Sequence, residues 1–187
     1  MRRLQVEAIL TSPGRGQPMG DSTWRHLAAR LVDVLASRPL TRTEGAEVRQ
    51  WLRPPEIDLF FDQSKADQRH GLNCAQFVAV STPERDDLIR AALLHDVGKR
   101  HAHLGPIGRT AVTTWAKLGG QTSGRAAIYL NHGEAGGEDL EATGAGRLVA
   151  DFARHHHEHR PESIPQEDWD VLQAADRAPN QVVRRKT

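Results

Sequence analysis

Apolar residues recur at intervals of three and four along most of the chain, the spacing that places them on one face of an α-helix. These stripes predict helices over residues 21–37, 44–52, 68–80, 84–97, 106–118, 124–140, 146–157 and 166–177. The segment IDLFF, residues 57–61, fits either a short helix or a buried extended piece. No segment shows the sustained alternation of a β-strand. The pattern therefore predicts an all-α fold, a compact bundle of six to nine helices.

The chain divides into one folded domain with extensions at both ends. Its 187 residues suit one compact domain rather than two. Residues 11–20, TSPGRGQPMG, are rich in glycine and proline, which is typical of a flexible connection. We expect a flexible segment over 1–20, a helical extension over 21–44, the main domain over 45–180 and a basic tail over 181–187.

Charge and cysteine content exclude several classes of protein. The formal net charge is +1, so no overall field attracts nucleic acid or an anionic membrane, and the arginines near the two ends are a weak nucleic-acid signal. Cys74 is the single cysteine, which excludes an intrachain disulfide and favours a cytoplasmic location. Apolar runs reach only four or five residues, so we expect neither a membrane span nor a signal peptide. No pattern specifies an oligomeric state.

One carboxylate interrupts the apolar stripe of the predicted helix over 84–97, which Gly98 is expected to end. Asp96 falls near the middle of that stripe, and His95 lies on its edge. An isolated charge is costly to bury, so this carboxylate needs a cation, a metal or a cage of hydrogen bonds.

Histidine or aspartate also falls on the inward face of three further helices. His70 shares a face with Cys74, His156 projects toward the centre of the stripe in 146–157, and Asp176 lies on the inner side of the last helix. A single inward histidine is usually a hydrogen-bonded core residue, and Cys74 is interpreted as a packing residue. Four helices that each carry such a residue indicate a shared polar site.

Imidazole and carboxylate ligands together are typical of a divalent transition metal such as iron, manganese, nickel, cobalt or zinc. A thiolate-rich structural zinc site is excluded by the single cysteine. The glycine patterns of dinucleotide-binding folds, P-loops and serine hydrolases are absent from the sequence, as is the calcium-binding loop of an EF-hand.

The sequence AALLHDVGK, from Ala91 to Lys99, resembles the central motif of the HD-domain metal-dependent phosphohydrolases. The order of His70, the His95–Asp96 doublet and Asp176 is similar to the order of the ligands in that family. DQRHGLNCAQFV, YLNHGEAGGEDLEATG, FARHHHEH and VLQAADR resemble other segments of its bacterial branch. The resemblance covers roughly residues 45–178, and it implies that the bundle is an HD domain.

The resemblance implies a set of site residues. The four basic metal ligands would be His70, His95, Asp96 and Asp176. Branches with a two-metal centre carry extra histidines that match His132, His156 and His157, although the run 155–157 leaves the register open by one residue. Lys99 matches the lysine that faces substrate phosphate, and Asp96 and Lys99 would be the catalytic residues. The Gly-Tyr-Pro signature of the branch that cleaves cyclic-di-GMP is missing after His157.

The implied activity is hydrolysis of a small phosphate ester, such as a nucleotide, by water activated on one or two metal ions. The partner would then be a small phosphorylated substrate. Two alternatives stay open: a di-iron oxygenase on the same fold, and a non-catalytic nucleotide-sensing or scaffold protein that keeps the metal for stability.

Overall fold

The computed structural model describes residues 38–178, so the segments expected at 1–20, at 181–187 and over most of 21–44 lie outside the described residues. Within this range the chain forms nine α-helices and one 3-10 helix, and no strand. The all-α prediction is confirmed. No helix in this range is long and apolar enough to cross a lipid bilayer. The elements are α3 (Arg42–Trp51), α4 (Pro54–Phe61), α5 (Lys65–Ser81), α6 (Asp86–Leu94), η1 (Val97–Ala102), α7 (Pro106–Lys117), α8 (Arg125–Leu130), α9 (His132–Ala142), α10 (Arg147–His155) and α11 (Gln166–Arg177).

Local capping explains where the first helices begin. Thr41 and Glu44 form a capping box at the start of α3, and Ser64 caps α5. Pro54 and Pro55 follow α3 and form the first turn of α4, a position where proline's missing N–H costs no hydrogen bond. The segment IDLFF is therefore helical.

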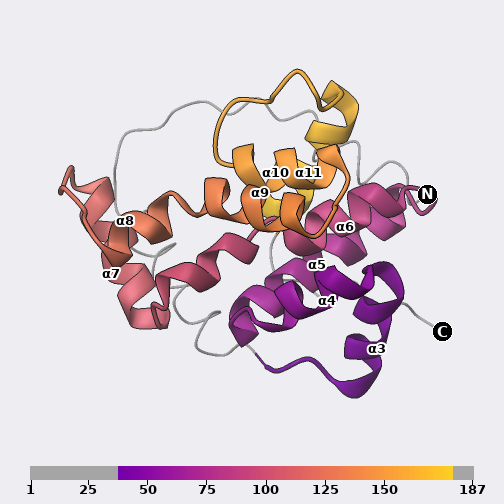
Figure 1. Ribbon diagram of the computed structural model, residues 1–187, viewed down its shortest axis with the longest axis horizontal. Coiled ribbons are helices and arrows are strands. Elements are labelled where there is room, and N and C mark those ends of the chain that lie inside the picture. Colours follow the sequence, from indigo (N-terminus) through magenta and orange to yellow (C-terminus); the bar gives the residue numbers. More distant parts are fainter. Residues whose placement is uncertain (1–37, 179–187) are drawn as a thin grey trace.

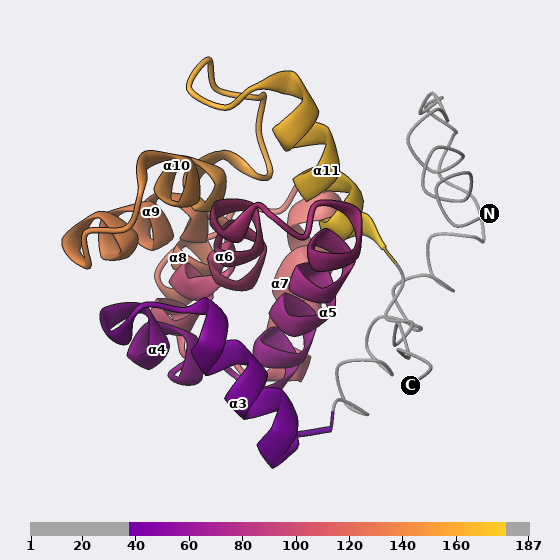
Figure 2. The same cartoon turned by 90° about the vertical axis from the view of Figure 1, so that its right-hand side faces the viewer.

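Helices α5 and α6 pack against each other, and α3 and α4 pack against α6. Helix α10 packs on α6 and α9, and α11 packs on α5 and α6. Figure 1 shows α7 and α8 together at one end of the molecule, with α3 on the opposite side, and Figure 2 shows the same arrangement from the side. Large apolar side chains fill the interior between these helices, among them Phe60, Leu72, Leu93, Phe152 and Leu172.

Two ion pairs join α6 to neighbouring helices. Arg90 is buried and pairs with the buried Glu56 of α4. Arg85, just before α6, donates to both carboxylate oxygens of Asp168 on α11, at 2.8 and 2.9 Å. Such bidentate pairs fix the orientation of the helices that they join.

Helix α6 ends earlier than the apolar stripe predicts. It ends at Leu94, His95 and Asp96 form a turn, and the chain continues as η1. Gly98, expected to stop the helix, instead lies within η1 where this segment crosses α9. A Cβ on Gly98 would overlap the His132 carbonyl oxygen and lie 2.7 Å from the Gly136 nitrogen. Glycine is therefore required here by the close approach of two backbones.

Replacing Gly98 with alanine should destabilise the fold. The added methyl group has to push η1 away from α9, which we expect to cost about 3 kcal/mol of unfolding free energy. Gly45→Ala is the matched control, because a Cβ there has no atom within 4 Å. This substitution should raise the unfolding free energy by about 0.5–1 kcal/mol, since alanine favours the helix over glycine. Urea denaturation would measure both. Equal effects of the two substitutions would contradict the close approach.

Candidate metal centre

The structure brings together the seven residues that the sequence marks as candidate metal ligands. They reach one region from five helices or helix ends: α5, the turn after α6, the start of α9, the end of α10 and α11. With Cys74 they form two neighbouring groups. The His70 group contains His70, Cys74, His95 and Asp176, and the Asp96 group contains Asp96, His132, His156 and His157.

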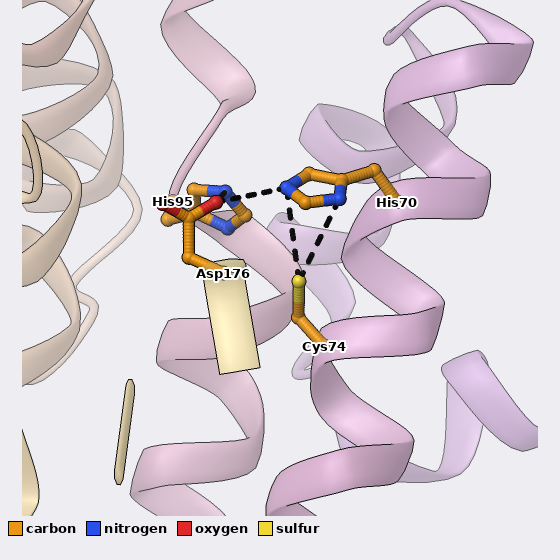
Figure 3. A group of neighbouring side chains, drawn as sticks. All are labelled: His70, Cys74, His95 and Asp176. Atoms are coloured by element: carbon orange, nitrogen blue, oxygen red, sulfur yellow. Dashed lines mark hydrogen bonds and ion pairs between the residues drawn. The ribbon is translucent and has the colours of Figure 1, made fainter. Parts of the chain in front are cut away.

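In the His70 group, two imidazoles point toward one carboxylate (Figure 3). The Nε2 atom of His70 lies 3.0 Å from Oδ1 of Asp176, and Nε2 of His95 lies 3.4 Å from the same oxygen. The side chains of His70 and Asp176 are 27% and 22% exposed, whereas that of His95 is 1% exposed. Solvent therefore reaches the group from the α5 and α11 side.

In the Asp96 group, two imidazoles approach one buried carboxylate oxygen. Oδ1 of Asp96 lies 3.3 Å from Nε2 of His132 and 3.4 Å from Nε2 of His156. The ring of His157 lies 5.2 Å from that of His132, measured between centroids. His157 is exposed while the other three residues are buried, so this group has one open side.

Asp96 and His95 connect the two groups. Oδ2 of Asp96 lies 3.5 Å from Nε2 of His95. The His95 ring lies between those of His70 and His156, at centroid distances of 5.1 and 5.0 Å. The two carboxylate oxygens of Asp96 therefore face different sets of histidines.

Backbone carbonyls fix the orientation of the three buried imidazoles. The Nδ1 atoms of His95, His132 and His156 lie 2.9, 2.7 and 2.9 Å from the carbonyl oxygens three residues earlier in the chain. A carbonyl only accepts hydrogen bonds, so each Nδ1 carries the proton. In a neutral ring the lone pair is then on Nε2, the atom that points into the centre.

Four buried polar atoms converge without a hydrogen-bond partner among the described residues: Nε2 of His95, His132 and His156, and Oδ1 of Asp96. Burying such atoms unpaired costs about 1–3 kcal/mol each. A divalent cation would accept electron pairs from all of them, and nitrogen with carboxylate oxygen is a donor set that suits a transition metal. These residues therefore fit a metal ion.

The carboxylates control the protonation of the buried centre. Burial lowers the pKa of His95, but Asp96 and Asp176 outweigh burial and raise that pKa to about 9. Burial raises the pKa of Asp96, but Lys99 and His95 outweigh it and hold the pKa well below its ordinary range. Burial also raises the pKa of the half-buried Asp176, but His70 and His95 outweigh it and lower that pKa, so both carboxyl groups are ionised at neutral pH.

Two histidines of the Asp96 group, His156 and His157, are held neutral. Burial lowers the pKa of His156, and burial together with His156 and His132 lowers the pKa of His157 to about 3. A neutral imidazole can donate an electron pair to a metal, whereas an imidazolium cannot. His156 and His157 are therefore in a metal-binding protonation state at neutral pH.

Lys99 lies beside the centre. Its Nζ donates to Oδ2 of Asp96 at 2.5 Å, and its side chain is 14% exposed. Burial lowers its pKa, but Asp96, Asp67 and Tyr129 outweigh burial and raise it. The ammonium is therefore charged and held at the edge of the centre.

Within residues 38–178, the structure places the remaining histidines outside the two groups. In the run 155–157, His156 and His157 belong to the Asp96 group, whereas the ring of His155 pairs with Glu158 at 2.9 Å. His101 pairs with Asp139 at 2.7 Å. The apolar stripe of α10 could distinguish inward from outward histidines, but it could not show which inward histidines meet.

Cys74 is a member of the His70 group that the sequence did not indicate. Its Sγ lies 3.8 and 3.7 Å from the two ring nitrogens of His70 and donates to the Ala175 carbonyl. The nearly equal distances place the sulfur against the ring rather than along one lone pair. Burial raises the pKa of the thiol to about 12. The spacing of four residues from His70 was the available signal, and it is equally typical of packing.

A family model described as HD domain matches residues 68–181. No curated protein and no solved structure matches significantly. The matched range runs from just before His70 to just after Asp176, so it contains both groups.

Metal binding should depend on pH because a cation has to displace the proton of His95. The raised pKa of His95 stabilises the metal-free fold below about pH 6.5, and this contribution is lost as the pH rises toward about 9. Metal affinity rises over the same interval. We expect the increase in melting temperature on adding Mn²⁺ or Zn²⁺ to be larger at about pH 8.5 than at about pH 6.5.

Thermal unfolding with and without a chelator would measure this increase. His156→Gln should lose most of it, while His101→Gln should behave like the wild type, because His101 lies outside both groups. A chelator without effect, or an equal increase at both pH values, would contradict the prediction.

Proposed function

The chain belongs to the HD-domain family, and from that membership we propose that it is a metal-dependent phosphohydrolase that acts on a small phosphate ester such as a nucleotide. The observation that carries the proposal is the convergence of four buried, unpartnered donor atoms next to the charged ammonium of Lys99. A metal-binding group beside a fixed positive charge suits a phosphate ester, because both can interact with the negatively charged oxygens on the phosphorus atom.

We assign the metal ligands by group. His70, His95, Asp96 and Asp176 would hold one ion, and His132, His156 and His157 would hold a second with Asp96 between them. Support comes from the two carboxylate oxygens of Asp96, which face different histidines. The donor set fits iron, manganese, nickel, cobalt or zinc.

A bound divalent cation would supply the Lewis acidity that activates water and polarises the phosphoryl group. The residues of the chain have three other tasks in the proposed reaction. Lys99 would stabilise negative charge on the phosphoryl oxygens, Asp96 would accept a hydrogen bond from the attacking water and orient it, and the carbonyl-anchored rings would keep their Nε2 atoms directed inward. His157 would line the open side of the Asp96 group, where substrate enters.

A substrate panel would test the proposal. Purified protein, with Mn²⁺, Fe²⁺, Co²⁺, Ni²⁺ or Zn²⁺ in separate reactions, would be assayed on nucleotides, sugar phosphates and cyclic dinucleotides. We expect metal-dependent phosphate release that Asp96→Asn abolishes and His101→Gln preserves. Cyclic-di-GMP should be a poor substrate, because the Gly-Tyr-Pro signature is missing.

Two results would overturn the proposal. One is full turnover by Asp96→Asn, which would assign the activity to a contaminant. The other is a coloured, iron-containing protein that hydrolyses no member of the panel, which would favour oxygen chemistry at the same site.

Lys99→Met should reduce kcat/KM by about a hundredfold while metal content stays the same, because it removes a positive charge from the transition state without removing a ligand. Lys65→Met is the matched control, since Lys65 is an exposed residue at the start of α5. Elemental analysis and steady-state kinetics would measure both effects. Loss of the metal in Lys99→Met would assign Lys99 a role in positioning Asp96 instead.

A further inference from the structure

A second cluster, of three charged side chains and one tyrosine, adjoins the Asp96 group. It contains Asp67 from α5, Lys99 from η1, Arg109 from α7 and Tyr129 from α8. We call it the Arg109 cluster. Arg109, Asp67 and Tyr129 are not among the candidate ligands of the metal centre, so their association needs a separate explanation.

Arg109 joins α7 to the central helix α5. Among the α-helices, α7 packs mainly on α8, yet Nη1 of Arg109 donates to both carboxylate oxygens of Asp67 on α5, at 2.7 and 2.5 Å. Its Nε donates to the Leu104 carbonyl at 2.9 Å. The side chains of Arg109 and Asp67 are only 13% and 9% exposed. The guanidinium is therefore held in a fixed, nearly buried position.

That position is close to the proposed metal ligands. Asp67 precedes His70 by three residues on α5, so the two side chains lie on the same helix face, about 4.5 Å apart along the axis. On its other side, the Arg109 guanidinium lies over the Tyr129 ring, 5.7 Å from the centroid. The Tyr129 ring stacks on that of His132, at 6.1 Å and 28°. Arg109 thus contacts one residue a helical turn before His70 and another that stacks on His132.

Lys99 is the member of the Arg109 cluster that contacts the metal centre. Its ammonium contacts Asp96, and Asp96 together with Asp67 raises the pKa of Lys99 against the effect of burial. Outside the metal ligands, the cluster has two cations, Lys99 and Arg109, and one carboxylate, Asp67, which leaves one positive charge. A single nitrogen of Arg109 serves both oxygens of Asp67, so this pair lacks the side-on, two-nitrogen geometry in which a guanidinium binds an oxyanion best.

We propose that the Arg109 cluster is the subsite for a second phosphoryl group, so that the substrate contains at least two linked phosphoryl groups. This inference rests on the proposed function, because the first phosphoryl group would bind at the metal centre beside Lys99. The second would bind the fork of Arg109, which exchanges its contact with Asp67 for phosphate oxygens. In the absence of substrate, Asp67 holds Arg109 in place as its counter-ion.

The test compares the affinities of two anions for metal-loaded protein. Isothermal titration would give the dissociation constants of pyrophosphate and orthophosphate, with metal content measured before and after each titration. The wild type should bind pyrophosphate at least about tenfold more tightly, the effect of one additional charge-assisted contact. Arg109→Gln should reduce this ratio to near one, and Arg109→Lys should give an intermediate ratio because lysine keeps the charge but loses the fork.

Two further variants complete the experiment. Asp67→Asn should increase the ratio, because it removes the competing carboxylate and keeps the shape of the side chain. Arg147→Gln should leave the ratio at the wild-type value, since Arg147 is 83% exposed and lies at the opposite end of α10 from His156. Circular dichroism would establish that each variant is folded.

The results separate this inference from the proposed function. An Arg109-dependent preference for pyrophosphate supports the subsite even if the substrate panel shows no hydrolysis. No preference in the folded wild type, or a preference that Arg109→Gln leaves intact, overturns the subsite even if the panel shows hydrolysis of monophosphates.

Discussion

The buried carboxylate of Asp96 is the constraint on which the centre of this molecule depends. It is 2% exposed and is surrounded by His95, His132, His156 and the ammonium of Lys99. An ionised carboxylate in such a position is stable only when positive charge surrounds it. In the metal-free protein Lys99 and protonated His95 supply that charge, and a divalent cation can replace the proton of His95.

The helices around Asp96 are arranged so that these groups can approach it. The glycine at position 98 allows η1 and α9 to cross at backbone contact, which brings His132 next to the His95–Asp96 turn. The carbonyl three residues before each buried histidine fixes its Nδ1, so the packing of the helices sets the direction of Nε2. Rigid backbone positions thus prepare the donor atoms before any ligand binds, and a preorganised site of this kind loses little entropy on binding.

Charge changes in character from the interior of the site toward α7 and α8. The interior contains two ionised carboxylates and several imidazoles, whereas the next layer contains the cations Lys99 and Arg109 with Asp67 as a counter-ion. A metal ion suits the first environment and phosphoryl oxygens suit the second. The two adjoining environments therefore suit an elongated anionic substrate, with one phosphoryl group at the metal centre and another beside Arg109.

The sequence by itself determined the all-α class and the approximate position of most helices, because helical periodicity is a local property of the chain. It also marked Asp96 and His156 as charged or polar residues on apolar stripes, and both are buried. The end of α6 could not be predicted from the stripe, because the turn at His95 and Asp96 depends on the crossing with α9. The contact of Cys74 with His70 could not be predicted either, because the local pattern around Cys74 is typical of a packing residue. The pairing of Arg109 with Asp67 could not be predicted because charged residues in such positions are typical of a solvated helix face. Periodicity shows which way a side chain points from its own helix, whereas its partner is decided by how separate helices pack, and that packing depends on contacts between residues far apart in the chain.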